Sequence, residues 1–298
     1  ILSLFFYLNK ILRINLSFFL KLYFKKIIRK NNYDIFHFHL LNFKTLYVLK
    51  ILKDLDQKVV VTVHGIDIQI DANINYGYRL NKLYEKNFLN VVSKIDKFFS
   101  ISQNIKNDLL ELGVTENKII MVPNGIEKVK FLQFEESKQN INNKIFLITV
   151  ARFAKEKKGF DLIPLIAKML NEKKINFQWT IVGYNSKQIR MIDNMNDFER
   201  NFKYLNNIEN LDEKFFPHND LIKIYKNNHI YINLARIESF GMTIMEALAS
   251  GLPVVTFDTK GGNELIKNDY NGIIIKKLSP EQIVNAIDHY NKSTILYE

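Results

Sequence analysis

The sequence of 298 residues contains no cysteine. Without a thiol there is no disulfide, no thiolate nucleophile and no cysteine-ligated zinc or iron–sulfur centre, which removes several classes of enzyme. A long uncharged apolar run is also missing. The apolar, aromatic stretch at residues 1–20 is interrupted by Lys10 and Arg13, so it does not predict a transmembrane helix. Basic residues follow this stretch instead of preceding it, which is not the order found in a cleavable signal peptide.

Positive charge dominates the composition, with 42 Lys and Arg residues against 31 Asp and Glu residues and a formal net charge of +11. Such an excess suits nucleic acid, an anionic membrane surface or phosphorylated substrates. It is concentrated early in the chain, where Lys21, Lys25, Lys26, Arg29 and Lys30 follow the apolar stretch. We expect an amphipathic helix here, which either packs on a sheet with a solvated basic face or rests on anionic lipid.

Short β-rich apolar runs alternate with segments of helical period from Asp34 onward, a pattern typical of parallel sheets covered by helices. Residues 1–130 contain a first series and residues 144–298 a second, and the polar segment 131–143 is the predicted linker. We therefore expect an α/β protein with two Rossmann-like, doubly wound domains that face a cleft, with the ligand site beyond the carboxyl ends of the strands. The predicted strands are 34–38, 58–63, 97–101, 119–122, 145–151, 177–182, 229–234, 253–257 and 272–275. The predicted helices are 43–55, 78–95, 103–112, 160–170, 220–226, 242–250 and 280–290.

The most informative stretch holds Glu238 and Glu246, which are separated by seven residues. A predicted strand leads to Gly241, and the helix expected from Met242 onward presents free backbone N–H groups at its start. This arrangement predicts an anion site. Glu246 lies on the same helix and can accept hydrogen bonds from ribose hydroxyls, while Glu238 can reach the sugar end of the same ligand.

A basic loop places Arg152, Lys157 and Lys158 between a predicted strand and a predicted helix. Fixed cations and helix-end amides stabilise the negative charge of a phosphate group without a metal. Arginine adds bidentate geometry, whereas lysine supplies a mobile point charge. Taken alone, such a loop is also explained by solvated cations. Beside the two glutamates, we interpret it as a phosphate site.

The context Glu-Ser-Phe-Gly-Met-Thr-Ile-Met-Glu, followed by Gly-Leu-Pro-Val-Val, resembles the Glu-x7-Glu signature of family 4 retaining glycosyltransferases, which have the GT-B fold. The resemblance implies that Glu238 contacts the transferred sugar and Glu246 the nucleotide ribose. It further implies that Arg152 and Lys158 clamp the diphosphate, with Lys157 as an adjacent candidate. The remaining donor-binding candidates are Ser239, Phe240, Gly241, Met242 and Thr243.

His64 ends a predicted buried strand and is similar to the family's strand-end histidine, which implies a position near the transferred sugar and the acceptor. A capped structural histidine is the alternative. His37 and His39 occupy alternate positions, hence one face of a predicted strand, and we favour packing over metal binding for them. No metal site is expected. A Gly-Gly-x-Glu likeness adds Gly262 and Glu264 as donor-loop candidates, together with Gly183.

The sequence departs from the family pattern in three places. No Gly-rich loop is visible near the start of the chain, which begins at Ile1 and not at a methionine. We therefore expect that the N-terminal strand and loop are missing from the sequence as given, which would cripple the chain as an enzyme. Gly183 and Tyr184 lie where Gly-x-Gly is common, and Leu234 and Ala235 lie where Pro-Ser is common.

We expect a metal-independent retaining hexosyl transfer from a nucleoside-diphosphate sugar to a glycan or lipid-linked acceptor, in the biosynthesis of a bacterial surface polysaccharide. No cofactor is expected. The expected partners are the donor, the acceptor and an anionic membrane surface, with no nucleic acid, and the expected location is the cytoplasm, with peripheral attachment at the inner face of the membrane as an option. The alternatives are a nucleotide-sugar epimerase or phosphorylase of the same fold, a basic nucleic-acid-binding module and an inactive scaffold.

Overall fold

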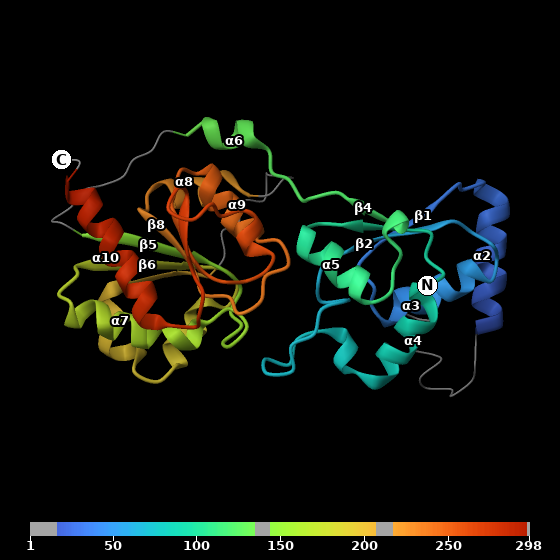
Figure 1. Ribbon diagram of the computed structural model, residues 1–298, viewed down its shortest axis with the longest axis horizontal. Helices are drawn as coiled ribbons and strands as arrows, with labels where there is room; N and C mark the ends of the chain where they lie inside the picture. The colour runs from blue at the N-terminus through green and yellow to red at the C-terminus, as the bar shows by residue number, and fades with distance from the viewer. Residues whose placement is uncertain (1–16, 135–143, 207–216, 297–298) are drawn as a thin grey trace. The chain divides into compact units, whose positions relative to one another are not determined.

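The computed structural model describes residues 17–134, 144–206 and 217–296 (Figure 1). Contacts divide the chain into two units, one ending at Pro123 and the other beginning at Asn124. This division lies a few residues before the predicted domain end at 130. Residues Lys128–Leu132 form a short helix, α6, that the sequence analysis did not predict. Most of the predicted linker, from 135 to 143, lies outside the described residues.

The first unit contains a parallel sheet, with the strand order β1-β2-β3-β4 in the described part of the chain. The central strand β2 has the sequence Val-Val-Val-Thr-Val, and its residues Val59, Val61 and Val63 are completely buried. Such a run is typical of a strand covered on both faces. The strands are β1 (Phe36–His39), β2 (Val59–Val63), β3 (Lys97–Ser100) and β4 (Ile119–Met121). The helices are α2 (Ser17–Asn31), α3 (Phe43–Lys53), η1 (Tyr78–Leu80), α4 (Lys82–Val92), α5 (Gln103–Glu111) and η2 (Glu116–Lys118).

Helix α2 lies within the segment for which the sequence predicted an amphipathic helix. It contacts α3, and its residues Leu20 and Phe24 are buried. Lys21 approaches Asp54, just beyond α3, at 3.9 Å between Nζ and Oδ2. Within the described ranges, no helix combines the length and the apolar character that crossing a membrane requires.

The helix predicted at residues 78–95 is divided in two. The turn η1 ends before Asn81, whose backbone is extended, with φ −81° and ψ 115°. The Asn81 side chain then accepts hydrogen bonds from the backbone N–H groups of Leu83 and Tyr84, which is the geometry of an N-cap. A new helix, α4, therefore begins within the segment whose apolar periodicity predicted one continuous helix.

The second unit contains a parallel sheet with the order β10-β9-β8-β5-β6-β7. The chain enters at β5 and adds strands on both sides of it, so this sheet is doubly wound. Strand β7, at the sheet edge beside β6, is absent from the sequence prediction. The strands are β5 (Ile145–Val150), β6 (Phe177–Val182), β7 (Phe202–Leu205), β8 (Ile230–Asn233), β9 (Val254–Phe257) and β10 (Gly272–Ile275). The helices are α6, η3 (Phe160–Leu162), α7 (Ile163–Glu172), η4 (Ser186–Met191), η5 (Met195–Asn201), α8 (Asn219–Lys226), α9 (Met242–Ala249), η6 (Gly262–Glu264) and α10 (Pro280–Leu296).

Helices cover both faces of the second sheet (Figure 1). On one face, α7 and α10 pack in a cluster that includes Trp179 and Phe257. On the other face, α8 and α9 contribute Tyr225 and Ile244 to a second cluster. The second cluster packs α9 against the sheet, with the first residue of the helix at Met242, shortly after the end of β8.

Trp179, the single tryptophan of the sequence, is fully buried and donates from Nε1 to the hydroxyl of Thr149 at 3.1 Å. That hydroxyl donates in turn to the carbonyl of Ile232 at 2.7 Å. We expect Thr149→Val to lower the free energy of unfolding by about 1–3 kcal/mol, because the indole N–H loses its acceptor inside the core. Urea unfolding followed by tryptophan fluorescence measures this loss. Thr149→Ser keeps the hydroxyl and should remain closer to the wild type; an unchanged midpoint for Thr149→Val would contradict the expectation.

Candidate functional site

Three loops of the second unit meet at one edge of its sheet. They follow β5, β8 and β9, which are neighbours in the sheet, and the carboxyl ends of parallel strands lie at the same edge. The backbone N–H of Arg236 donates to the carbonyl of Lys157 at 3.0 Å. The backbone N–H of Gly261 donates to the carbonyl of Glu238 at 3.1 Å. The β8 loop is therefore tied by its backbone to the loops on both sides.

Glu238 and Lys158 form an ion pair across two of these loops. Lys158 Nζ lies 2.9 Å from Glu238 Oε2, and the side chains are 19% and 17% exposed. Lys157 is partly buried, and burial followed by the charges of Lys158 and Arg152 lowers the pKa of Lys157 to about 8, against the opposing effect of Glu238. Arg152 is exposed. The three predicted phosphate-binding cations thus lie close enough to influence one another.

Arg236 fixes the shape of the basic loop. Its guanidinium donates to both carboxylate oxygens of Asp161, at 2.8 and 2.6 Å, and also to the carbonyl of Glu156. Bidentate, charge-assisted pairs of this kind are among the strong hydrogen bonds of proteins. The bonds to Asp161 raise the pKa of Arg236. The sequence analysis did not identify Asp161, because 75 residues separate it from Arg236 and no local pattern links them.

Two glycines allow these loops to pack closely. A Cβ at Gly159, where φ is 68°, would lie 2.1 Å from the carbonyl oxygen of Leu234. A Cβ at Gly183, where φ is 140°, would lie 2.2 Å from the carbonyl oxygen of Ala151. Of the predicted donor-loop residues, Gly183 therefore supports the β5 loop through backbone packing.

The other two predicted donor-loop residues lie in the short helix η6, after β9. Gly262 is buried, and a Cβ there would lie 2.6 Å from Oγ1 of Thr259 and 3.9 Å from Cβ of Glu238. Glu264 is exposed at the end of the same helix. Gly262 thus lies beside the loop that carries Glu238.

Helix α9 begins directly after Gly241, which has φ 93°, and no described side chain caps this end. The backbone N–H groups of a first helical turn have no intrahelical acceptor, so they can bind an anion. Ser239 and Phe240 are buried in the approach to the helix. Met242 and Thr243 are partly buried in its first turn, and Thr243 Oγ1 accepts a hydrogen bond from the Tyr231 hydroxyl at 2.7 Å.

Glu246 lies on α9 and is 8% exposed. Its Oε2 accepts a hydrogen bond from the hydroxyl of Tyr225 at 3.0 Å. Burial raises the pKa of Glu246 to about 7, and the bond from Tyr225 opposes this effect. Tyr225 is fully buried on α8 and was not identified from the sequence, since its partner lies on another helix.

In the first unit, the predicted residue His64 follows β2 and is held by Asp67. The backbone N–H groups of His64 and Gly65 donate to Asp67 Oδ1 at 3.1 and 2.9 Å, and that of Leu41 donates to Oδ2 at 3.1 Å. Asp67 is completely buried, and burial raises its pKa to about 6 in spite of these bonds. The sequence analysis missed Asp67, although an Asp so soon after His-Gly is the signal of a side chain that bonds the backbone of its own turn.

Three histidines gather at this end of the first sheet. His39 Nδ1 lies 3.3 Å from His64 Nε2, and the rings of His37 and His39 lie 4.5 Å apart. His37 Nε2 lies 2.8 Å from Oγ1 of Thr62. Burial, followed by the proximity of His39, lowers the pKa of His64, which favours the neutral imidazole. In the part of the chain that the structure covers, no three His, Asp or Glu side chains are grouped so that they could hold a metal ion.

The predicted site residues therefore form two groups, one in each unit. Family models match both. The model for glycosyl transferases group 1 matches residues 132–298, more than half of the chain, and the model for glycosyltransferase family 4 matches residues 3–129. The chain belongs to the group 1 glycosyl transferases. The family resemblance predicted from Glu238 and Glu246 is thereby confirmed.

This glycosyltransferase has curated relatives at modest identity. It is 26% identical to the UDP-N-acetylglucosamine–peptide N-acetylglucosaminyltransferase GtfA subunit of Streptococcus agalactiae, over 78% of this chain and 45% of the relative. It is 24% identical to the UDP-Gal:alpha-D-GlcNAc-diphosphoundecaprenol alpha-1,3-galactosyltransferase of Escherichia coli, over 91% of this chain and 70% of the relative. The chain spans about half the length of the first curated relatives that it matches.

Solved glycosyltransferase structures share the fold. The enzyme from Rickettsia africae superposes with a TM-score of 0.69 at 19% identity, over 93% of this chain and 70% of that structure. HepE from Anabaena, solved with UDP and glucose, gives a TM-score of 0.64 at 16% identity, over 91% of this chain and 72% of that structure. With the two parallel sheets described above, these likenesses confirm the predicted GT-B class of fold.

We expect Glu246→Gln to stabilise this glycosyltransferase above pH 7. The pKa of Glu246 rises from an ordinary value of 4.5 to about 7 on folding. Between these values the native state keeps a proton that the unfolded state has lost, so stability falls as the pH rises through this window. Glutamine keeps an acceptor for the Tyr225 hydroxyl and removes the titration. The free energy of unfolding of the variant should exceed that of the wild type by the least near pH 5 and by about 1–3 kcal/mol near pH 8.

Urea unfolding of wild type and variant over this pH range measures the difference. Glu156→Gln, at an exposed glutamate of the basic loop, is the matched control and should show no such trend. An advantage of Glu246→Gln that is the same at both ends of the pH range would contradict the burial of an ionising carboxyl group.

Proposed function

We propose that this chain transfers a hexosyl unit from a nucleoside-diphosphate sugar to a glycan or lipid-linked acceptor, with retention of configuration and without a metal. The observation that carries the proposal is the ion pair between Lys158, on the loop after β5, and Glu238, on the loop that leads into α9, with Arg152 and Lys157 on the same loop as Lys158. Cations for a diphosphate, the amides of a helix start and the carboxyl group of Glu246 are thereby gathered on one unit.

The relatives support the class of donor and acceptor. The Escherichia coli relative is named for UDP-Gal and for a diphosphoundecaprenol-linked sugar. HepE was solved with UDP and glucose. We extend a nucleotide-sugar donor and a lipid-linked or glycan acceptor to this chain, and we propose a role in making a bacterial surface polysaccharide at the cytoplasmic face of the membrane.

In the proposed donor complex, the diphosphate replaces the Glu238 carboxylate as the partner of Lys158. Arg152 is exposed and can meet two phosphate oxygens with its planar guanidinium. Lys157, with a pKa of about 8, is mostly protonated at neutral pH, and an adjacent phosphate raises that pKa. Glu238, released from Lys158, turns to the hydroxyl groups of the transferred sugar.

In the proposed transfer step, the bond between sugar C1 and the phosphate oxygen breaks while a bond between C1 and the acceptor oxygen forms on the same face. The departing phosphate oxygen keeps the electron pair of the broken bond and takes the proton of the acceptor hydroxyl. Arg152, Lys158 and the first amides of α9 stabilise the charge of the leaving group. Glu246 accepts hydrogen bonds from the ribose, and we assign His64, in the first unit, to the side of the sugar and the acceptor.

We expect one nucleotide among UDP, GDP, ADP and CMP to stabilise the whole chain, with or without magnesium. A ligand at 100 times its dissociation constant adds about 2.7 kcal/mol of stability, which a thermal-shift assay detects. Lys158→Gln should abolish the shift, because it removes a phosphate-binding cation. Lys155→Gln, at an exposed lysine of the same loop, is the matched control and should retain it. No shift with any nucleotide, or an undiminished shift in Lys158→Gln, would reject the donor site.

We expect Glu238→Ala to lower kcat for sugar transfer by a factor of about 10²–10³, the usual effect of removing one group that stabilises a transition state. Nucleotide affinity should change little, because the proposed contact is with the sugar and Lys158 becomes available to the diphosphate. Isothermal titration with the nucleotide measures the affinity, and an assay of nucleoside-diphosphate release in the presence of donor and acceptor measures kcat. Equal losses of affinity and turnover would assign Glu238 to nucleotide binding instead.

A further inference from the structure

Helix α2 exposes large apolar side chains over its first half. Phe18 and Phe19 are 65% and 64% exposed, Leu22 is 47% exposed and Tyr23 is 37% exposed. The same helix is anchored by Leu20 and Phe24, which are buried. Because the anchoring residues lie on the opposite side of the helix, these four side chains do not belong to the core. A cluster of exposed aromatic and aliphatic groups on one helix marks a surface for a partner.

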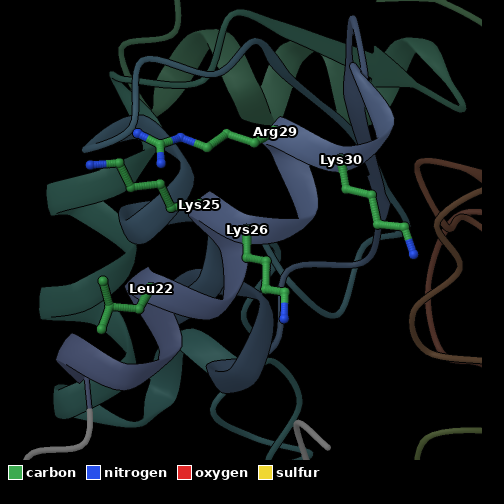
Figure 2. Close-up of a pocket in the computed structure, with 5 residues that line it drawn as sticks. All are labelled: Leu22, Lys25, Lys26, Arg29 and Lys30. Carbon is green, nitrogen blue, oxygen red and sulfur yellow. The ribbon is translucent and has the colours of Figure 1, made fainter.

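The second half of α2 presents four cations. Lys25, Lys26, Arg29 and Lys30 line, together with Leu22, a shallow hollow that is open to solvent and is formed by side chains of α2 alone. Figure 2 shows Lys25 and Arg29 extending to one side of the helix and Lys26 and Lys30 to the other. The helical segment contains no acidic residue to neutralise them. The hollow is therefore a site with positive charge on both sides and an apolar residue at one end.

Apolar and basic groups are thus separated along the axis of α2, while both occupy its outward side. Nucleic acid would satisfy the four cations but would leave Phe18, Phe19 and Leu22 in water. A purely apolar partner would bury the aromatic residues but leave four cations without counter-charge. A bilayer interface with anionic lipid offers both environments within a few ångströms, with phosphates in the headgroup layer and acyl chains below it.

We propose that α2 is a docking helix for an anionic lipid bilayer. Phe18, Phe19 and Leu22 enter the boundary of the acyl chains. Lys25, Lys26, Arg29 and Lys30 bind the phosphate groups of the lipid heads around the hollow. This proposal rests on the first unit alone and does not depend on the transfer reaction proposed above.

The test is co-sedimentation of the whole chain with vesicles, without nucleotide. We expect binding to phosphatidylcholine vesicles with about 30% phosphatidylglycerol, and little binding to phosphatidylcholine alone. A variant with Lys25, Lys26, Arg29 and Lys30 changed to Gln should bind the anionic vesicles about 10²–10³-fold more weakly, because each cation near such a surface contributes several-fold. Added salt should weaken the binding of the wild type.

A matched control removes the same number of charges from exposed positions outside α2. This control should lose far less affinity than the α2 variant, and equal losses would show that net charge alone attracts the vesicles and would overturn the proposal. The control substitutions are Lys82→Gln, Lys86→Gln, Lys94→Gln and Lys168→Gln.

A second variant, Phe18→Ser with Phe19→Ser, tests the apolar half and should weaken vesicle binding by about tenfold or more. Circular dichroism and an unchanged midpoint of thermal unfolding show that each variant is folded. Two results would overturn the proposal. One is that the wild type self-associates, whereas this variant is monomeric and still binds vesicles as the wild type does. This result would assign the surface to a second copy of the chain. The other is that the wild type binds an oligonucleotide tightly, whereas the α2 charge variant loses this binding but keeps its affinity for vesicles.

Discussion

The arrangement of the candidate donor site depends on the guanidinium of Arg236. It joins the loop after β8 to the loop after β5 through Asp161 and the carbonyl of Glu156. A planar donor with fixed spacing can hold two oxygens of one carboxylate and still reach a third acceptor, which an ammonium group on a flexible stem does less well. With the basic loop fixed in this way, Lys158 reaches Glu238 on the neighbouring loop.

In our proposal, the ion pair of Lys158 and Glu238 takes the place of the diphosphate while no donor is bound. An isolated cluster of Arg152, Lys157 and Lys158 would repel itself, and the depressed pKa of Lys157 reflects its burial first and that repulsion second. Glu238 offsets part of this cost in the free protein. Because the pair is still partly exposed, its attraction is screened by water, so an incoming diphosphate with more charge and more acceptor atoms can displace the carboxylate at modest cost.

The sequence predicted those features of the structure that depend on residues close together in the chain. The valine-rich run of β2 and the Glu-x7-Glu context were recognisable because burial on two faces and a helix start leave marks on neighbouring residues. Pairings between distant segments leave no such mark. Arg236 and Asp161 lie 75 residues apart, and β7 becomes a strand through its pairing with β6 after two polar helical turns. The predicted helix is divided at Asn81 because the backbone of this one residue is extended. The apolar periodicity continues across Asn81, so the sequence analysis did not identify it as an N-cap.

Among the residues that the structure describes, each unit has one buried carboxyl group with a raised pKa near the carboxyl edge of its sheet, and the partners of the two groups differ. Asp67 accepts hydrogen bonds from the backbone N–H groups of Leu41, His64 and Gly65. Those bonds use most of its acceptor capacity, so Asp67 serves the local backbone. Glu246 accepts one side-chain bond within the described structure, from Tyr225. A carboxylate has about four acceptor positions, and leaving several unused in a buried site is costly unless a ligand fills them. Glu246, the less satisfied carboxyl group, is therefore the one that we propose binds a ribose.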